Sequence, residues 1–222
     1  MKNDFTQTNL FACPIYKIRV DPNSYDKEEI LKDIKYNKSL KNTRNDSHQN
    51  ISGISDIHHS YNDHDNVNFR IINYEKLIGT YSEILQDFFN NEIHTTKKYR
   101  FNFDIVNYSA ITEGQWMNAH NHIPDDFATT HYLNFKKDHI HTCFHNPINF
   151  TPFLKFIQPE LYNILWNDEG GENSYFEENF YFPVEEDDML IFPAALNHQI
   201  MTQWPTKEPR ITISANIKIL SA

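Results

Sequence analysis

The chain has 222 residues and a mass of 26.4 kDa, which is enough for one large domain with a full-sized hydrophobic core. Aromatic residues make up 14% of the sequence, and this much apolar material excludes a disordered chain. The 30 acidic residues outnumber the 20 basic ones. The resulting formal charge of -10 argues against a nucleic-acid partner, because nucleic-acid binding relies on clustered Lys and Arg.

Other simple features exclude further classes of protein. No apolar stretch approaches the roughly 20 residues that span a bilayer, so we expect no membrane partner. The opening MKNDFTQTNLF has no apolar signal-peptide core, and two cysteines cannot build a disulfide framework. These features predict a cytoplasmic protein. Only 5 glycines are present, and the absence of a GxGxxG or GxxxxGKS pattern argues against a Rossmann or P-loop nucleotide site.

The N-terminal third reads as a strand followed by helices. The segment from Asn9 to Val20 alternates as a strand does, and a turn then leads into a short helix from Tyr25 to about Tyr36. Residues 37–68 are polar and predict an irregular, surface-exposed excursion. A stronger helix is predicted after Asn73. Its apolar stripe consists of Leu77, Ile78, Tyr81, Ile84, Leu85, Phe88 and Phe89.

After Lys98 the hydrophobic period changes from 3.6 to 2, which predicts β-structure. Short strand candidates follow one another without intervening helices: YRFNFDIVNY, THYLNF, DMLIFP, HQIMT and RITISANIKIL. This pattern predicts a mainly β fold with flanking α-helices, built as a sandwich, jelly roll or barrel. We expect a single domain over 1–222, with a helical third of about 1–98 packed on a β core of about 99–222, because the amphipathic helix needs a sheet to cover it.

The first candidate for chemistry is the sequence His120–Asn121–His122. In an extended strand the side chains at i and i+2 share one face, so both imidazoles would point at one place, as two ligands of a single metal ion must. The pair Asp125–Asp126 follows and places carboxylates nearby. The pattern is weak by itself, because the chain has 12 histidines. A second such pattern contains His139 and His141, which we expect, with His145, to be surface or turn residues.

The second candidate is the C-terminal stretch from the strand DMLIFP to the end of the chain. It contains His198 and then a strand that starts at Arg210. In this strand isoleucines alternate with a polar row that includes Arg210 and Thr212. The pattern fits an edge strand with one solvated face. It equally fits the inside of a barrel that holds a charged ligand, since Arg grips a carboxylate through two parallel hydrogen bonds.

In their order along the chain, these features resemble the Fe(II)- and 2-oxoglutarate-dependent dioxygenases. The likeness is greatest to the prolyl-hydroxylase-like group and to the oxygenases common in bacteria and phages. It is carried by LFACPI from Leu10, by HNHIPDDFATTHYL from His120, by EDDMLIFPAALNHQI and by RITISAN. It covers most of the chain except 37–68. It implies a double-stranded β-helix core, a jelly roll like that of the cupins, and a place in the cytoplasm of a bacterial or phage-infected cell.

The resemblance also implies a set of metal ligands. His120 and His198 correspond to two of the three iron ligands. The third is normally the Asp or Glu of an HxD/E motif, and this chain has His122 at that position. Either His122 completes a three-histidine set, or Asp125 or Asp126 supplies the carboxylate. Strand parity favours His122.

For the cofactor, the resemblance implies that Arg210 holds the distal carboxylate of 2-oxoglutarate. Thr212 stands where the family's RxS motif has its serine, and Tyr132 matches a tyrosine that donates a hydrogen bond to the same carboxylate. The implied reaction uses O2 and 2-oxoglutarate to hydroxylate a substrate C–H bond, with release of succinate and CO2. The substrate, either a small molecule or a protein side chain, is not specified by the sequence.

Two other hypotheses remain open. One is a cupin-like metalloenzyme that uses three histidines without an oxo-acid, in which Arg210 would have no part in binding 2-oxoglutarate. The other is a non-enzymatic jelly-roll module that binds a partner or belongs to a virion, in which the histidines are ordinary polar residues and no metal is retained.

Overall fold

The computed structural model describes residues 13–40, 58–60, 67–147, 156, 157, 160 and 178–221. Most of the predicted excursion at 37–68 lies outside the described residues. The helices are α1 (Lys27–Ser39) and α2 (Glu75–Asn91). The strands are β1 (Tyr16–Arg19), β2 (His58–His59), β3 (Tyr99–Ile111), β4 (Met117–His120), β5 (Phe127–Asn134), β6 (Thr142–His145), β7 (Asn179–Tyr181), β8 (Asp188–Pro193), β9 (His198–Ile200) and β10 (Arg210–Ser221).

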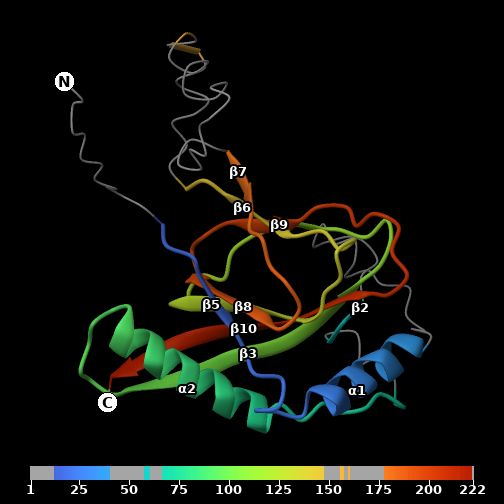
Figure 1. Cartoon of the computed structure of the whole chain (residues 1–222), viewed down its shortest axis with the longest axis horizontal. Coiled ribbons are helices and arrows are strands. Elements are labelled where there is room, and N and C mark those ends of the chain that lie inside the picture. Colours follow the sequence, from blue (N-terminus) through green and yellow to red (C-terminus); the bar gives the residue numbers. More distant parts are fainter. Residues whose placement is uncertain are drawn as a thin grey trace, which may run out of the picture.

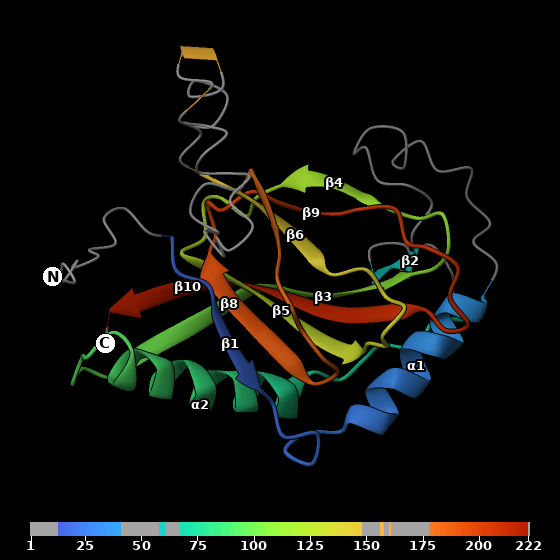
Figure 2. The same ribbon diagram turned by 45° about the horizontal axis from the view of Figure 1, so that its top comes forward.

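These strands form two antiparallel sheets (Figures 1 and 2). One sheet has six strands in the order β1-β8-β5-β10-β3-β2, and the other has four in the order β4-β9-β6-β7. Neighbours in each sheet are mostly far apart in sequence, which is the crossing connectivity of a jelly roll. The predicted fold class, mainly β with flanking helices around a jelly-roll core, is therefore confirmed.

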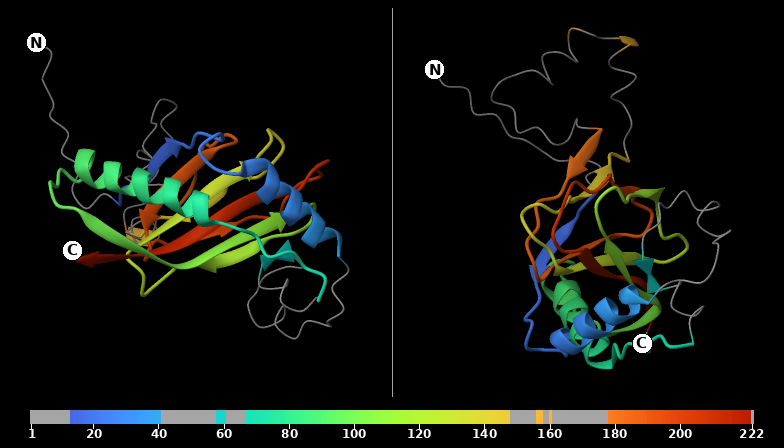
Figure 3. Two further views of the ribbon diagram at one scale, coloured as in Figure 1. Left: turned by 90° about the horizontal axis from the view of Figure 1, so that it is seen from below. Right: turned by 90° about the vertical axis from the view of Figure 1, so that its right-hand side faces the viewer.

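The six-stranded sheet is covered on its two faces by different layers. Its outer face packs under the helices, as Figure 3 shows, and contributes to a large apolar core. Its inner face packs against the four-stranded sheet, where Phe144 of β6 meets Phe192 of β8 at a ring separation of 5.1 Å. The first third of the chain supplies β1 and β2 to this same sheet as well as both helices.

Helix α2 forms where the apolar stripe predicted it. Its buried residues Leu77, Tyr81, Leu85, Phe88 and Phe89 recur at steps of three and four, so they lie along one side of the helix. They pack on isoleucines of β10. The burial of this stripe, at about 1.5–3 kcal/mol per large side chain, holds the helix on the sheet.

Strand β10 is a central strand, which decides between the two interpretations of its alternating pattern. It pairs with β3 on one edge and with β5 on the other. Ile211, Ile213 and Ile217 face the helices, whereas Arg210 and Thr212 are buried between the sheets. The interpretation of this segment as a solvated edge strand is therefore wrong, and the polar row lies inside the barrel.

The pairing of β5 with β10 contains a bulge next to this polar row. Tyr132 lies opposite Thr212 and Asn134 lies opposite Ile211, so Leu133 is an extra residue on β5. Leu133 is buried in the core under the helices, whereas Tyr132 is buried in the core between the sheets.

A buried histidine sits in the core under the helices. His131 is 0% exposed, and its Nδ1 lies 2.8 Å from the hydroxyl of Tyr81 on α2. Burial, together with the positive charge of Lys27, lowers the pKa of His131 to about 3. This side chain is therefore neutral in the folded protein at neutral pH.

We expect the free energy of unfolding to fall as the pH is lowered from about 6.5 towards 3. Below about 6.5 the unfolded chain binds a proton at this histidine and the folded chain does not, so His131 contributes a slope of up to about 1.4 kcal/mol per pH unit. Urea unfolding at a series of pH values measures the slope. His131→Phe should reduce the slope by the contribution of one proton. An unchanged slope would show that His131 is not neutral in the folded state.

Candidate metal centre

Three histidines come together at one end of the four-stranded sheet. His120 is the last residue of β4, His198 is the first of β9, and the two are paired across the strands. His122 lies two residues beyond the end of β4, where its N–H donates to the carbonyl of Ala194 at 2.8 Å. The expectation that His122 shares a strand face with His120 is therefore not the reason for its position, because β4 ends at His120. The loop, held by this hydrogen bond, orients the side chain instead.

The three imidazoles offer their ring nitrogens to one point. One nitrogen of each histidine lies within 4.8 Å of the corresponding nitrogens of the others. The Nε2 atoms of His122 and His198 are 3.3 Å apart. Two ligands about 2.1 Å from one ion, at angles of about 90–109°, are separated by about 3.0–3.4 Å. The spacing of this pair therefore fits two ligands of a single metal ion.

Backbone carbonyls fix which nitrogen of two rings faces the cluster. Nδ1 of His120 lies 2.8 Å from the carbonyl oxygen of Asn118, and Nδ1 of His198 lies 3.0 Å from that of Leu196. A carbonyl only accepts, so Nδ1 carries the proton in both rings and Nε2 keeps its lone pair. Hydrogen bonds of this kind are the usual outer support of metal-binding histidines.

Burial keeps the three rings neutral. It lowers the pKa of His198 to about 3, with help from His120, and that of His122 to about 4, again with a contribution from His120. The pKa of His120 is also lowered by burial. Phe144 and Phe192 line the cluster with ring separations of 5.7 and 4.9 Å from His198. Neutral imidazoles in an apolar setting suit Fe(II), Zn(II), Cu(II) or Ni(II).

No carboxylate belongs to the cluster in the described part of the chain. Asp126 has a different partner, because its Oδ2 accepts a hydrogen bond of 2.8 Å from the N–H of Ile219 on β10. Asp125 is likewise outside the group of candidate ligand atoms. The structure therefore brings His122, and neither aspartate, next to His120 and His198.

Arg210 extends from the six-stranded sheet across the interior to the four-stranded sheet. Its Nη2 donates to Oγ1 of Thr142 at 3.0 Å, and its Nε donates to the carbonyl of Ile140 at 3.1 Å. The guanidinium also lies 5.1 Å from the ring of Tyr132. Arg210 is 0% exposed, and its Nη1 has no hydrogen-bond partner. A buried guanidinium nitrogen without a partner is costly unless a ligand accepts from it.

Tyr132 and Thr212 lie in the same interior but differ in their contacts. The hydroxyl of Tyr132 is 2.6 Å from Oγ1 of Thr142, so it shares this partner with Arg210. The hydroxyl of Thr212 instead lies 3.0 Å from that of Ser109 on β3. Sequence reasoning missed Thr142, because its partners are distant in the chain and β6 is too short to show a pattern.

The pairing of β6 with β9 gives the distance between the histidine cluster and the contact of Arg210 with Thr142. Phe144 lies opposite His198, and Thr142 lies two residues away on the same face of β6. Two residues of strand span about 7 Å. The contact of Arg210 with Thr142 is therefore about 7 Å along the strand from the level of His198.

The expectation that His139 is a surface or turn residue is half right, because His139 closes a turn with Lys136 but is not on the surface. It is buried, its Nδ1 accepts from the N–H of Lys136 at 3.0 Å, and its Nε2 lies 2.9 Å from the carbonyl of Glu208. It thereby ties the loop after β5 to the loop that leads into Arg210. His141 is half-buried, and its Nδ1 accepts from the N–H of Val184 at 3.3 Å.

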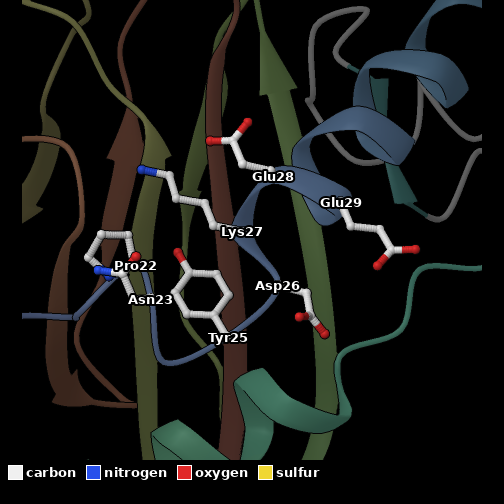
Figure 4. Close-up of a pocket in the computed structure, with 7 residues that line it drawn as sticks. All are labelled: Pro22, Asn23, Tyr25, Asp26, Lys27, Glu28 and Glu29. Carbon is white, nitrogen blue, oxygen red and sulfur yellow. The ribbon is translucent and has the colours of Figure 1, made fainter.

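A separate pocket lies at the start of α1 (Figure 4). It is lined by Pro22, Asn23, Tyr25, Asp26, Lys27, Glu28 and Glu29. The ring of Tyr25 lies 5.6 Å from that of His131, which faces the helices. The pocket is therefore on the other side of the sheet from Tyr132, and none of the candidate metal ligands lines it. Neither described helix has the length and apolar composition to cross a membrane.

Comparisons with known proteins place the fold but not the family. No family model matches the chain, and no curated protein matches its sequence. Among solved structures, a prolyl hydroxylase from Trichoplax adhaerens, in complex with a hypoxia-inducible factor peptide fragment, is similar with a TM-score of 0.50 and 13% identity over 92% of this chain and 83% of that one. At this identity the likeness supports the fold alone.

Two more distant structures carry related descriptions. HygX from Streptomyces hygroscopicus, solved with nickel and 2-oxoglutarate, has a TM-score of 0.47 and 10% identity over 93% of this chain and 83% of that one. A 2OG-Fe(II) oxygenase family oxidoreductase from Burkholderia pseudomallei has a TM-score of 0.43 and 9% identity. The match spans 67% of this chain and only 60% of the Burkholderia protein.

We expect the protein to bind a single Mn(II) ion, used here as an air-stable substitute for Fe(II). His198→Ala and His122→Ala should each weaken binding by more than about 100-fold, because even the loss of an outer-shell contact costs about 10- to 100-fold. Isothermal titration calorimetry measures the affinity.

Asp126→Asn is the matched control for this measurement. It keeps an oxygen that can accept from the N–H of Ile219, so the loop should hold its shape and metal affinity should stay unchanged. If Asp126→Asn lost Mn(II) binding while His122→Ala kept it, the third ligand would be Asp126 and not His122.

Proposed function

We propose that the protein is an Fe(II)- and 2-oxoglutarate-dependent dioxygenase that hydroxylates a C–H bond of its substrate. The observation that carries the proposal is the buried Arg210, whose Nη1 lacks a partner in the same interior as the three-histidine cluster. The fold likeness and the motif resemblance support the same assignment. The substrate is a small molecule or a protein side chain.

His120, His122 and His198 would hold Fe(II) on one side and leave positions for the oxo-acid and O2. Iron with these co-substrates supplies the oxidation: the C–H bond becomes C–OH, one oxygen atom of O2 enters the product, and the other enters the succinate that forms from 2-oxoglutarate with loss of CO2. The protein binds and orients the reactants and excludes water, here with the rings of Phe144 and Phe192.

The charges of the residues favour a dianionic ligand. Three neutral imidazoles leave the full 2+ charge on a bound metal ion, and Arg210 adds a further positive charge in the same interior. Among the described residues no carboxylate pairs with Arg210 or joins the histidines. A dianion with one end at the metal and the other at the guanidinium would balance most of this charge.

The spacing also fits 2-oxoglutarate. The separation of about 7 Å between the level of His198 and Thr142 suits a five-carbon diacid whose oxo-acid end binds the metal and whose far carboxylate meets Arg210. Arg210 would donate from Nη1 to that carboxylate, and Tyr132 lies beside it. We place the enzyme in the cytoplasm, since a reducing compartment keeps iron as Fe(II) and suits the free cysteines Cys13 and Cys143.

The other two hypotheses make different predictions. A cupin-like three-histidine enzyme would bind the metal but would not need Arg210 for an oxo-acid. A non-enzymatic jelly-roll module would retain no metal. The unpartnered Nη1 of Arg210 favours the dioxygenase, because neither alternative gives this nitrogen an acceptor.

We expect 2-oxoglutarate to raise the melting temperature of the Mn(II)-loaded protein, and Arg210→Met to weaken its binding by at least about 100-fold. The variant removes two charge-assisted hydrogen bonds of about 1.5–3 kcal/mol each and keeps a long, unbranched side chain without charge. The Fe(II) protein should form succinate from 2-oxoglutarate in the presence of O2 and a substrate, and Arg210→Met should not.

Arg100→Met is the matched control. Arg100 is exposed on β3 and lies opposite Leu220, at the far end of β10 from Arg210, so the same loss of charge should leave 2-oxoglutarate affinity unchanged. Metal binding without any response to 2-oxoglutarate would favour the cupin-like enzyme, and no metal binding at all would favour the non-enzymatic module.

A further inference from the structure

Thr142 joins the two sheets at the candidate cofactor site. It is the first residue of β6 in the four-stranded sheet and is only 1% exposed. Its Oγ1 lies 3.0 Å from Nη2 of Arg210 and 2.6 Å from the hydroxyl of Tyr132, both of which come from the six-stranded sheet. One small hydroxyl therefore contacts both groups that the proposed function places at the far carboxylate.

The hydrogen-bonding capacity of these groups is limited. A guanidinium nitrogen only donates, so Thr142 must accept from Arg210. The threonine has one further lone pair and one hydrogen for Tyr132. Whichever hydroxyl donates in the Thr142–Tyr132 contact, one of the two hydroxyl hydrogens remains unused. Together with the free N–H groups at Nη1 of Arg210, the cluster presents several hydrogen-bond donors, which an acceptor-only carboxylate matches.

We infer that Thr142 is a positioning residue for oxo-acid binding, which orients the guanidinium of Arg210 and the phenol of Tyr132 towards a carboxylate. This inference rests on the proposed function. Nε of Arg210 donates its one N–H to the carbonyl of Ile140, and Nη2 donates one of its two N–H groups to Thr142. Both N–H groups of Nη1 and the second N–H of Nη2 are left for a ligand. Without the hydroxyl, Nη2 and the phenol both lose a buried partner.

The test compares three variants of the Mn(II)-loaded protein by calorimetric titration with 2-oxoglutarate. Thr142→Val keeps the shape of the side chain and removes the hydroxyl, and it should weaken 2-oxoglutarate binding by about tenfold or more. Thr142→Ser restores the hydroxyl and should restore most of the affinity. Mn(II) affinity, measured separately, should be the same in all variants, because Thr142 is not among the candidate metal ligands.

Thr129→Val is the matched control. Thr129 is also a buried threonine, 1% exposed, and its hydroxyl has no hydrogen-bond partner. The same chemical change at this position should leave 2-oxoglutarate affinity unchanged. An equal loss in both variants would mean that any buried threonine is sensitive, and it would overturn the inference.

The remaining outcomes are also decisive. No binding of 2-oxoglutarate by the unaltered protein would refute the proposed function itself. Binding that depends on Arg210 but is unchanged in Thr142→Val would overturn the role of Thr142 alone. If Thr142→Val fails to fold, a structure of the unaltered protein with Mn(II) and 2-oxoglutarate decides. Thr142 within hydrogen-bonding distance of both Arg210 and Tyr132 supports the inference, and an Arg210 that has left Thr142 to reach the ligand overturns it.

Discussion

The cationic side chain of Arg210 lies between two sheets, away from water and without a carboxylate partner among the described residues. Burial of such a charge is costly, and it lowers the pKa of the guanidinium from its ordinary value. A carbonyl, a threonine hydroxyl and the face of Tyr132 offset part of this cost. The backbone at Arg210 belongs to a central strand, because β10 is paired with β3 on one edge and with β5 on the other.

The histidine cluster complements this buried charge. Desolvation makes all three rings poor bases, so their lone pairs are available for a metal ion at neutral pH without competition from protons. Both His120 and His198 are further constrained by backbone carbonyls that hold Nδ1. The interior thus combines a neutral set of nitrogen donors, which can hold a metal ion, with a fixed cation at Arg210.

Local sequence patterns predicted the elements better than their assembly. The apolar stripe of α2 and the alternation of β10 are periodic over many residues, so both could be recognised in the sequence. The order of strands in the two sheets could not, because it depends on contacts between distant segments. His120 and His122 were singled out by their spacing, and the family resemblance added His198 as a further ligand. Thr142 could not be found this way, because its contact with Arg210 spans 68 positions of the chain and arises only when the sheets meet. The burial of His139 was not predicted, because the polar sequence of its turn gives no sign that the ring contacts two loops.

Residues of β5 beside the bulge at Leu133 alternate between two environments. Tyr132 faces the core between the sheets, whereas its neighbours His131 and Leu133 face the helices. Because side chains alternate along a strand, the gain or loss of one residue here would exchange these environments and send the phenol towards α2. This part of the chain should therefore accept replacement of individual side chains more readily than any change in its length.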